Sequence, residues 1–106
     1  MDIAEKKQEI SKDIKDNRVV LYMKGNKMAP MCGFSGQVVH ILTQSGVSFE
    51  TRDILQDEVL RQAIKEYSDW PTLPQLYVDG EFIGGCDIIT ELYQSGELQP
   101  ILESNA

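Results

Sequence analysis

The sequence predicts an α/β protein with a four-stranded mixed sheet that is flanked by helices on both faces. Segments with helical and with strand periodicity follow one another in the order α-β-α-β-α-β-β-α-α. A helix joins the first two predicted strands, which implies that they run parallel. The dipeptide Asp79-Gly80 between two short apolar runs predicts a type I′ hairpin, which adds an antiparallel pair.

The first part of the chain predicts a surface helix and a buried strand. Residues 2–17 place isoleucines on one stripe among charged residues, as an amphipathic helix does. These isoleucines are Ile3, Ile10 and Ile14. The β-branched and aromatic run at 18–24 predicts a strand that is buried on both faces, ended by Gly25. Residues 26–31 are expected to form a loop.

A second helix and a second strand are predicted next. The helix spans residues 33–45, with Gly46 at its C-terminal cap. Its apolar stripe consists of Phe34, Val38, Ile41 and Leu42. The alternating residues at 47–54 predict the strand.

The last part of the chain predicts a third helix, the hairpin and a final helical segment. Residues 56–70 form the third helix, with Asp57 as its N-cap. Its apolar stripe consists of Leu60, Ala63, Ile64 and Tyr67. The hairpin spans residues 75–85, and residues 86–104 predict a helix that breaks at Gly96 and continues for one or two turns.

Length and composition predict a single domain over residues 1–106 and narrow the class of partner. The formal net charge of −7 argues against a nucleic-acid or an anionic membrane partner. No segment approaches the roughly 20 apolar residues of a membrane span, and the N-terminus lacks the apolar core of a signal peptide. Two cysteines are too few for a disulfide framework, so we expect a cytoplasmic protein in a reducing environment. The alternative is the processed mature form of an organellar protein.

The lone cysteine Cys32 directly precedes the second predicted helix. Unpaired N–H groups and partial positive charge at a helix start favour a thiolate, which is both a nucleophile and a metal ligand. The alternative is a loop cysteine that behaves as a small hydrophobic residue. Ser35 occupies the position where a redox protein often carries a second cysteine, and its hydroxyl cannot resolve a mixed disulfide. The thiolate therefore needs an external thiol or a metal.

Three motifs together resemble the monothiol glutaredoxins of the CGFS class in their single-domain form. They are CGFS at 32–35, WPTLPQLYVDGEFIGG at 70–85 and the CD that follows at 86–87. The resemblance covers nearly the whole chain and implies a thioredoxin-like fold. It also implies that the external thiol is glutathione.

The resemblance implies a glutathione site with Cys32 as its catalytic thiol. Lys24 and Arg61 would contact the glycine carboxylate, although without the resemblance each is an ordinary solvated charge. A cis bond before Pro74 would turn the backbone of Leu73 toward the tripeptide, and Gly84 and Gly85 would let it lie close. Cys86 and Asp87 would receive the γ-glutamyl end at a helix start, where Asp87 can also act as a cap. The implied contacts are Lys24, Cys32, Arg61, Thr72, Leu73, Pro74, Gly85, Cys86 and Asp87.

A 2Fe–2S cluster needs four ligands, and this chain has only Cys32 and Cys86. The resemblance implies a cluster shared across a homodimer, held by Cys32 of each protomer and two glutathione thiols, with Cys32 as the metal ligand. A carrier of this kind would pass the cluster to apo iron–sulfur proteins, with a BolA-like protein as a further partner. The alternative is a glutathione-dependent oxidoreductase that removes glutathione from protein disulfides by a monothiol mechanism. The five-residue loop NKMAP at 26–30 is longer than dithiol glutaredoxins need, which by analogy favours the carrier.

Three other residues, His40, Trp70 and Cys86, have side chains that can take part in chemistry. His40 lies eight residues after Cys32 on the same predicted helix, roughly 12 Å away, so we expect a surface residue rather than a Cys–His pair. Trp70 is expected to pack the turn before Pro71 without a chemical role. Cys86 is expected near the site, where it either forms a disulfide with Cys32 under oxidation or remains an inert thiol.

Overall fold

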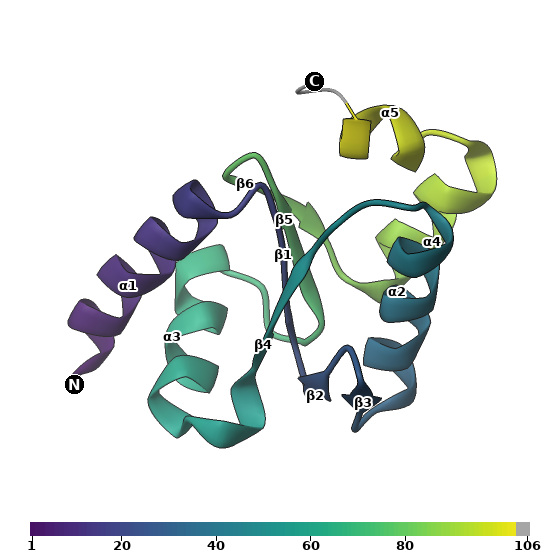
Figure 1. Ribbon diagram of the computed structural model, residues 1–106. Helices are drawn as coiled ribbons and strands as arrows, with labels where there is room; N and C mark the ends of the chain where they lie inside the picture. Colours follow the sequence, from purple (N-terminus) through teal and green to yellow (C-terminus); the bar gives the residue numbers. More distant parts are fainter. Residues whose placement is uncertain (104–106) are drawn as a thin grey trace.

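A computed structural model describes residues 1–103 and contains the predicted four-stranded mixed sheet (Figure 1). Its strand order is β4 (Glu50–Asp53), β1 (Val19–Met23), β5 (Gln75–Val78) and β6 (Glu81–Gly84). β1 runs parallel to β4 and antiparallel to β5, and β5 and β6 form the antiparallel hairpin. Asp79 and Gly80 at its turn both have positive φ, as a type I′ turn requires.

Helices cover both faces of the sheet, which confirms the predicted fold class (Figure 1). On one face lie α1 (Ile3–Asp16) and α3 (Glu58–Ser68), which pack on Val20 and Tyr22 of β1. On the other face lie α2 (Gly33–Gln44), α4 (Cys86–Ser95) and α5 (Leu98–Glu103), which pack on the remaining residues of β1. All five residues of β1 are buried, as predicted for a strand covered on both faces.

The ends of the helices follow local sequence signals. The Asp57 side chain accepts a hydrogen bond from the Leu60 N–H at 3.1 Å and caps α3 as predicted. Gly46 and Gly96 follow α2 and α4 with φ of +75° and +80°, the left-handed conformation that glycine favours at helix ends. Residue 104, the predicted end of the final helical segment, lies outside the described residues.

Two apolar positions on the predicted helix stripes lie outside the core. Phe34 in the first turn of α2 is 63% exposed, and it lines the cavity beside Cys32 instead of packing on the sheet. Tyr67 near the end of α3 is 36% exposed, although its ring still approaches that of Tyr77 at 6.2 Å between centroids. The periodicity therefore predicted the helices correctly but assigned too many residues to the core.

The segment at 26–31, expected to be a loop, contains a small hairpin. Its strands are β2 (Gly25–Asn26) and β3 (Ala29–Pro30). The Asn26 side chain closes the turn by accepting hydrogen bonds from the N–H groups of Met28 and Ala29. Gly25 has φ of +88°, and a Cβ there would lie 2.5 Å from the Ala29 carbonyl oxygen. The expectation of an irregular loop was therefore wrong.

The strand expected at 47–54 is shorter than predicted. β4 begins at Glu50, and a 3-10 turn, η1 (Ile54–Gln56), replaces its end. The Asp53 side chain accepts hydrogen bonds from the N–H groups of Leu55 and Gly25, which starts the turn and ties it to the β2–β3 hairpin. Among residues 1–103, no helix combines the length and the apolar character that crossing a bilayer requires.

Candidate functional site around Cys32

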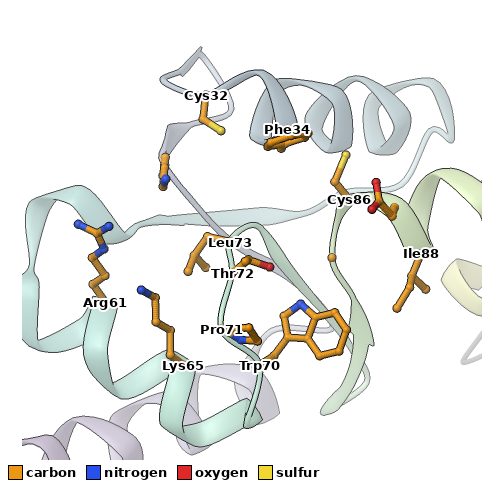
Figure 2. A pocket seen from close by; sticks show the side chains of 13 residues that line it. Cys32, Phe34, Arg61, Lys65, Trp70, Pro71, Thr72, Leu73, Cys86 and Ile88 are labelled. Carbon is orange, nitrogen blue, oxygen red and sulfur yellow. The ribbon is translucent and has the colours of Figure 1, made fainter.

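A cavity of about 410 Å³ lies beside Cys32, where the end of β1, the starts of α2 and α4, α3, and residues 70–73 meet (Figure 2). Most of the residues proposed from the resemblance line it. They are Lys24, Cys32, Arg61, Thr72, Leu73, Gly85, Cys86 and Asp87. Pro74 is buried behind the wall, and the bond between it and Leu73 is cis, as expected. The fold thus gathers positions that are far apart in the sequence around one thiol.

Cys32 is the N-cap residue of α2, with extended backbone and a half-buried side chain. The backbone N–H of Ser35 lowers the pKa of Cys32 below the ordinary value of a thiol and is the largest of several influences. The Phe34 N–H and the Lys24 ammonium act in the same direction, whereas burial opposes them. This is the direction predicted from the position of Cys32 at a helix start.

Ser35 has a structural role that the sequence did not indicate. Its side chain is fully buried, and its Oγ accepts a hydrogen bond from the Lys24 N–H at 3.2 Å. The same hydroxyl also lowers the pKa of Cys32. Ser35 therefore connects the end of β1 to the first turn of α2 and supports the thiolate. Its spacing from Cys32 showed only that a second thiol was missing.

Three cations lie along the cavity: Lys24 at the end of β1, and Arg61 and Lys65 one turn apart on α3. Within residues 1–103, none of these three side chains forms a salt bridge. Figure 2 shows Arg61 and Lys65 on the side of the cavity opposite Cys86. Lys65 was missed by the sequence analysis, although its spacing of four residues from Arg61 was an available signal. Unpaired cations in a concave site suit a ligand with carboxylate groups.

Trp70 does more than pack a turn. It lines the cavity together with Pro71 (Figure 2). Its ring also lies 5.8 Å from that of Phe82, measured between centroids. Its indole N–H is buried and has no hydrogen-bond partner within the described residues. A Cβ at Gly85 would lie 3.3 Å from the Pro74 carbonyl oxygen and 3.4 Å from this nitrogen. Gly85 therefore lies directly against the wall formed by this segment.

The other two residues that the sequence singled out have simple positions. Cys86 begins α4, lines the cavity, and lies 3.9 Å from the Thr90 hydroxyl, measured from Sγ to Oγ1. Both cysteines are free thiols, and a disulfide between them under oxidation stays a prediction. His40 is exposed on α2, in agreement with a surface residue.

Comparison with known proteins identifies the family. The family model named glutaredoxin matches residues 19–83, which include Lys24, Cys32, Arg61 and the wall at 70–73. The chain belongs to the glutaredoxin family. Its relatives are monothiol members, and one, from Synechocystis sp., is 57% identical over 99 residues, covering 93% of this chain and 92% of the relative. A probable monothiol glutaredoxin 2 from Rickettsia conorii is 57% identical over 95 residues, covering 90% and 89% of the two chains.

This monothiol glutaredoxin also resembles solved structures. The solution structure of reduced apo GrxS14 from poplar is 55% identical to it, with a TM-score of 0.82, and the match covers 92% of this chain and 90% of that one. This likeness confirms the thioredoxin-like fold. Within residues 1–103, no three His, Cys, Asp or Glu side chains gather into a metal site. The cavity thus combines Cys32, whose pKa is lowered, with the free thiol of Cys86 and three cationic side chains.

Proposed function

We propose that this glutaredoxin binds glutathione beside Cys32 and carries a 2Fe–2S cluster between two copies of the chain. The observation that carries the proposal is the thiol of Cys32, with lowered pKa, in a cavity that three cations without salt bridges also line. Ser35 excludes resolution of a mixed disulfide within the motif, so the chemistry of Cys32 requires a partner thiol. A small thiol that carries carboxylates fits this cavity.

Glutathione would extend along the cavity from the three cations to the start of α4. The glycine carboxylate would bind near Lys24, Arg61 and Lys65, which supply positive charge. The peptide portion would pair with the backbone of Leu73 in the adjacent wall. The γ-glutamyl end would lie at the start of α4, where the helix N-terminus favours its carboxylate and Asp87 favours its ammonium group. This orientation brings the glutathione sulfur toward Cys32.

The cluster would be cargo that the protein carries, because one chain has too few cysteine ligands to hold it alone. Cys32 is a thiolate donor, and a cluster needs four ligands. Cys32 and one glutathione thiol from each of two copies supply them. Half of these ligands are diffusible, so the cluster can be passed to apo iron–sulfur proteins, with a BolA-like protein as a further partner. We propose the cytoplasm as the location, since free thiols require a reducing compartment.

A second candidate function uses the same cavity and the same thiolate. Cys32 would attack the glutathione sulfur of a protein–glutathione disulfide, and the protein thiolate would leave. A second glutathione thiolate would then attack the Cys32–glutathione disulfide, which releases glutathione disulfide and restores the Cys32 thiolate. The lowered pKa of Cys32 favours this reaction. We rank it second because, by analogy with the family, the longer segment before Cys32 would misplace glutathione for turnover. In this structure that segment forms the β2–β3 hairpin.

Anaerobic reconstitution with iron and sulfide, with and without glutathione, tests the proposal. Visible absorbance reports the cluster and size-exclusion mass reports the oligomer. We expect a coloured dimer that requires both glutathione and Cys32, and that Cys86→Ser still forms. The Cys32→Ser variant should remain a colourless monomer. A colourless wild-type monomer that rapidly reduces glutathione mixed disulfides would reject the carrier and support the enzyme.

A further inference from the structure

Gln75, the first residue of β5, is a buried amide that does not itself line the cavity. Its side chain is 0% exposed, and it shares this property with only one other polar or charged side chain in residues 1–103, that of Ser35. Burial of an amide is costly unless its donors and acceptor find partners. The partners of Gln75 therefore indicate why a polar residue is found here.

The Gln75 side chain forms hydrogen bonds with three groups. Its Nε2 donates hydrogen bonds to the carbonyl oxygens of Trp70 and Thr72, each at 3.2 Å. Its Oε1 accepts a hydrogen bond from the Tyr77 hydroxyl at 3.1 Å. Carbonyl oxygens can only accept, so these contacts fix which end of the amide faces which neighbour.

The two carbonyl groups belong to the wall of the cavity. Residues 70–73 lie between α3 and β5, have no helical or strand hydrogen bonding, and all line the cavity (Figure 2). At their N-terminal side, the Trp70 N–H donates to the Lys65 carbonyl and the Ser68 hydroxyl. Further along the segment, the Gln75 side chain binds the Trp70 and Thr72 carbonyl groups from the protein interior. Because the segment has no regular structure of its own, its shape depends on these few contacts.

We infer that Gln75 is a positioning residue for the ligand of the Cys32 cavity. By holding the Trp70 and Thr72 carbonyls, it fixes the wall against which the glutathione backbone lies. It acts on affinity through the wall and leaves the thiol itself unchanged, since it contacts neither Cys32 nor Ser35. This inference rests on the proposed binding of glutathione for its functional part, and on the hydrogen bonds of the free protein for its structural part.

Variants at Gln75 and Tyr77 separate the two hydrogen bonds that Gln75 donates to the wall from the one that it accepts from the Tyr77 hydroxyl. Gln75→Glu keeps the size of the side chain and an acceptor for the Tyr77 hydroxyl but loses both donors to the wall. Tyr77→Phe is the matched control, because it loses the hydroxyl contact and keeps both bonds to the wall. Gln75→Met is a third variant that removes the donors without adding charge. Backbone amide NMR spectra of each, alone and titrated with S-methylglutathione, measure wall geometry and affinity together.

For both Gln75 variants, we expect amide shifts at residues 70–73 in the free protein and a Kd about tenfold weaker, because a wall that is no longer held in place must be ordered when the ligand binds. The alkylation rate of Cys32 against pH should be unchanged. Tyr77→Phe should bind within about twofold of the wild type. Equal Kd values for folded Gln75→Met and the wild type would overturn the inference, as would affinity losses matched by Tyr77→Phe. Failure of the wild type to bind S-methylglutathione would reject the proposed function. Unchanged amide shifts at residues 70–73 in the free Gln75 variants would separately reject the role of Gln75 in the wall.

Discussion

At the sulfur of Cys32, the helix start and the Ser35 hydroxyl act together to favour the thiolate. The Ser35→Ala variant removes the hydroxyl but keeps the backbone N–H, the larger influence. We expect the pKa of Cys32 to rise, because one contact that favours the charged form is lost. The thiolate fraction should therefore rise at a higher pH than in the wild type, and alkylation by iodoacetamide reports that fraction. Rates measured against pH should show the midpoint move upward.

Ser45→Ala is the matched control for this experiment. Ser45 lies at the other end of α2 and also makes one side-chain hydrogen bond, to the Ile41 carbonyl at 2.8 Å. It should leave the alkylation profile of Cys32 unchanged. An unaltered midpoint in Ser35→Ala would contradict the role assigned to the hydroxyl.

Single residues differed in how far the sequence revealed their roles. Cys32 was predictable because a helix start is a local signal, and Lys24 and Arg61 followed from the resemblance. Ser35 and Gln75 were not, because their importance depends on full burial and on contacts with Lys24, Trp70 and Thr72 that only the folded chain brings together. The sequence therefore reveals a reactive group that a local motif defines. It does not reveal buried residues that position the site through contacts between distant segments.

At the scale of elements, one carboxylate joins α1 to two strands on the face away from Cys32. Asp13 accepts a hydrogen bond from the Tyr22 hydroxyl at 2.6 Å and pairs with Arg52 at 2.8 Å. Burial, and then the hydrogen bond to Asp13, raise the pKa of Tyr22 well above its ordinary value, so it remains a donor. Asp13→Ala removes the acceptor of the Tyr22 hydroxyl, the ion pair of Arg52 and one side-chain contact of Asn17. It should destabilise the fold by about 2 kcal/mol in urea unfolding.

The control for Asp13 lies one turn further along the same helix. Asp16 pairs with Lys12 at 2.6 Å, but both side chains are exposed. Its replacement by alanine should cost less than about 0.5 kcal/mol, as exposed ion pairs do. Equal losses of stability in the two variants would show that Asp13 contributes as an ordinary surface charge.

Helices and the β5–β6 hairpin were predicted well because their signals are repeated or strong. Periodic apolar residues defined α1, α2 and α3, and Asp79-Gly80 defined the hairpin turn. The β2–β3 hairpin was missed because each strand has two residues, too few for alternation to show. It depends instead on the turn made by the Asn26 side chain and on the anchoring of Gly25 to Asp53.

At the scale of the whole molecule, the cavity exists only in the folded chain. Its walls come from β1, α2, α3, α4 and residues 70–73, which are separated along the sequence. A ligand that spans them binds the folded state and has no equivalent site in the unfolded one. Binding must therefore add to the free energy of unfolding of the whole domain.

This linkage leads to a prediction for thermal unfolding. S-methylglutathione at ten times its Kd should stabilise the protein by about 1.4 kcal/mol and raise Tm by about 5 °C. Lys24→Met should reduce this increase, because it removes one of the unpaired cations of the cavity. Lys12→Met makes the same change on exposed α1 and should keep the full increase. An unchanged wild-type Tm at ligand concentrations that saturate the NMR titration would contradict this prediction. It would mean that the ligand binds the unfolded chain as well as the folded one, although the five regions form a site only when the chain is folded.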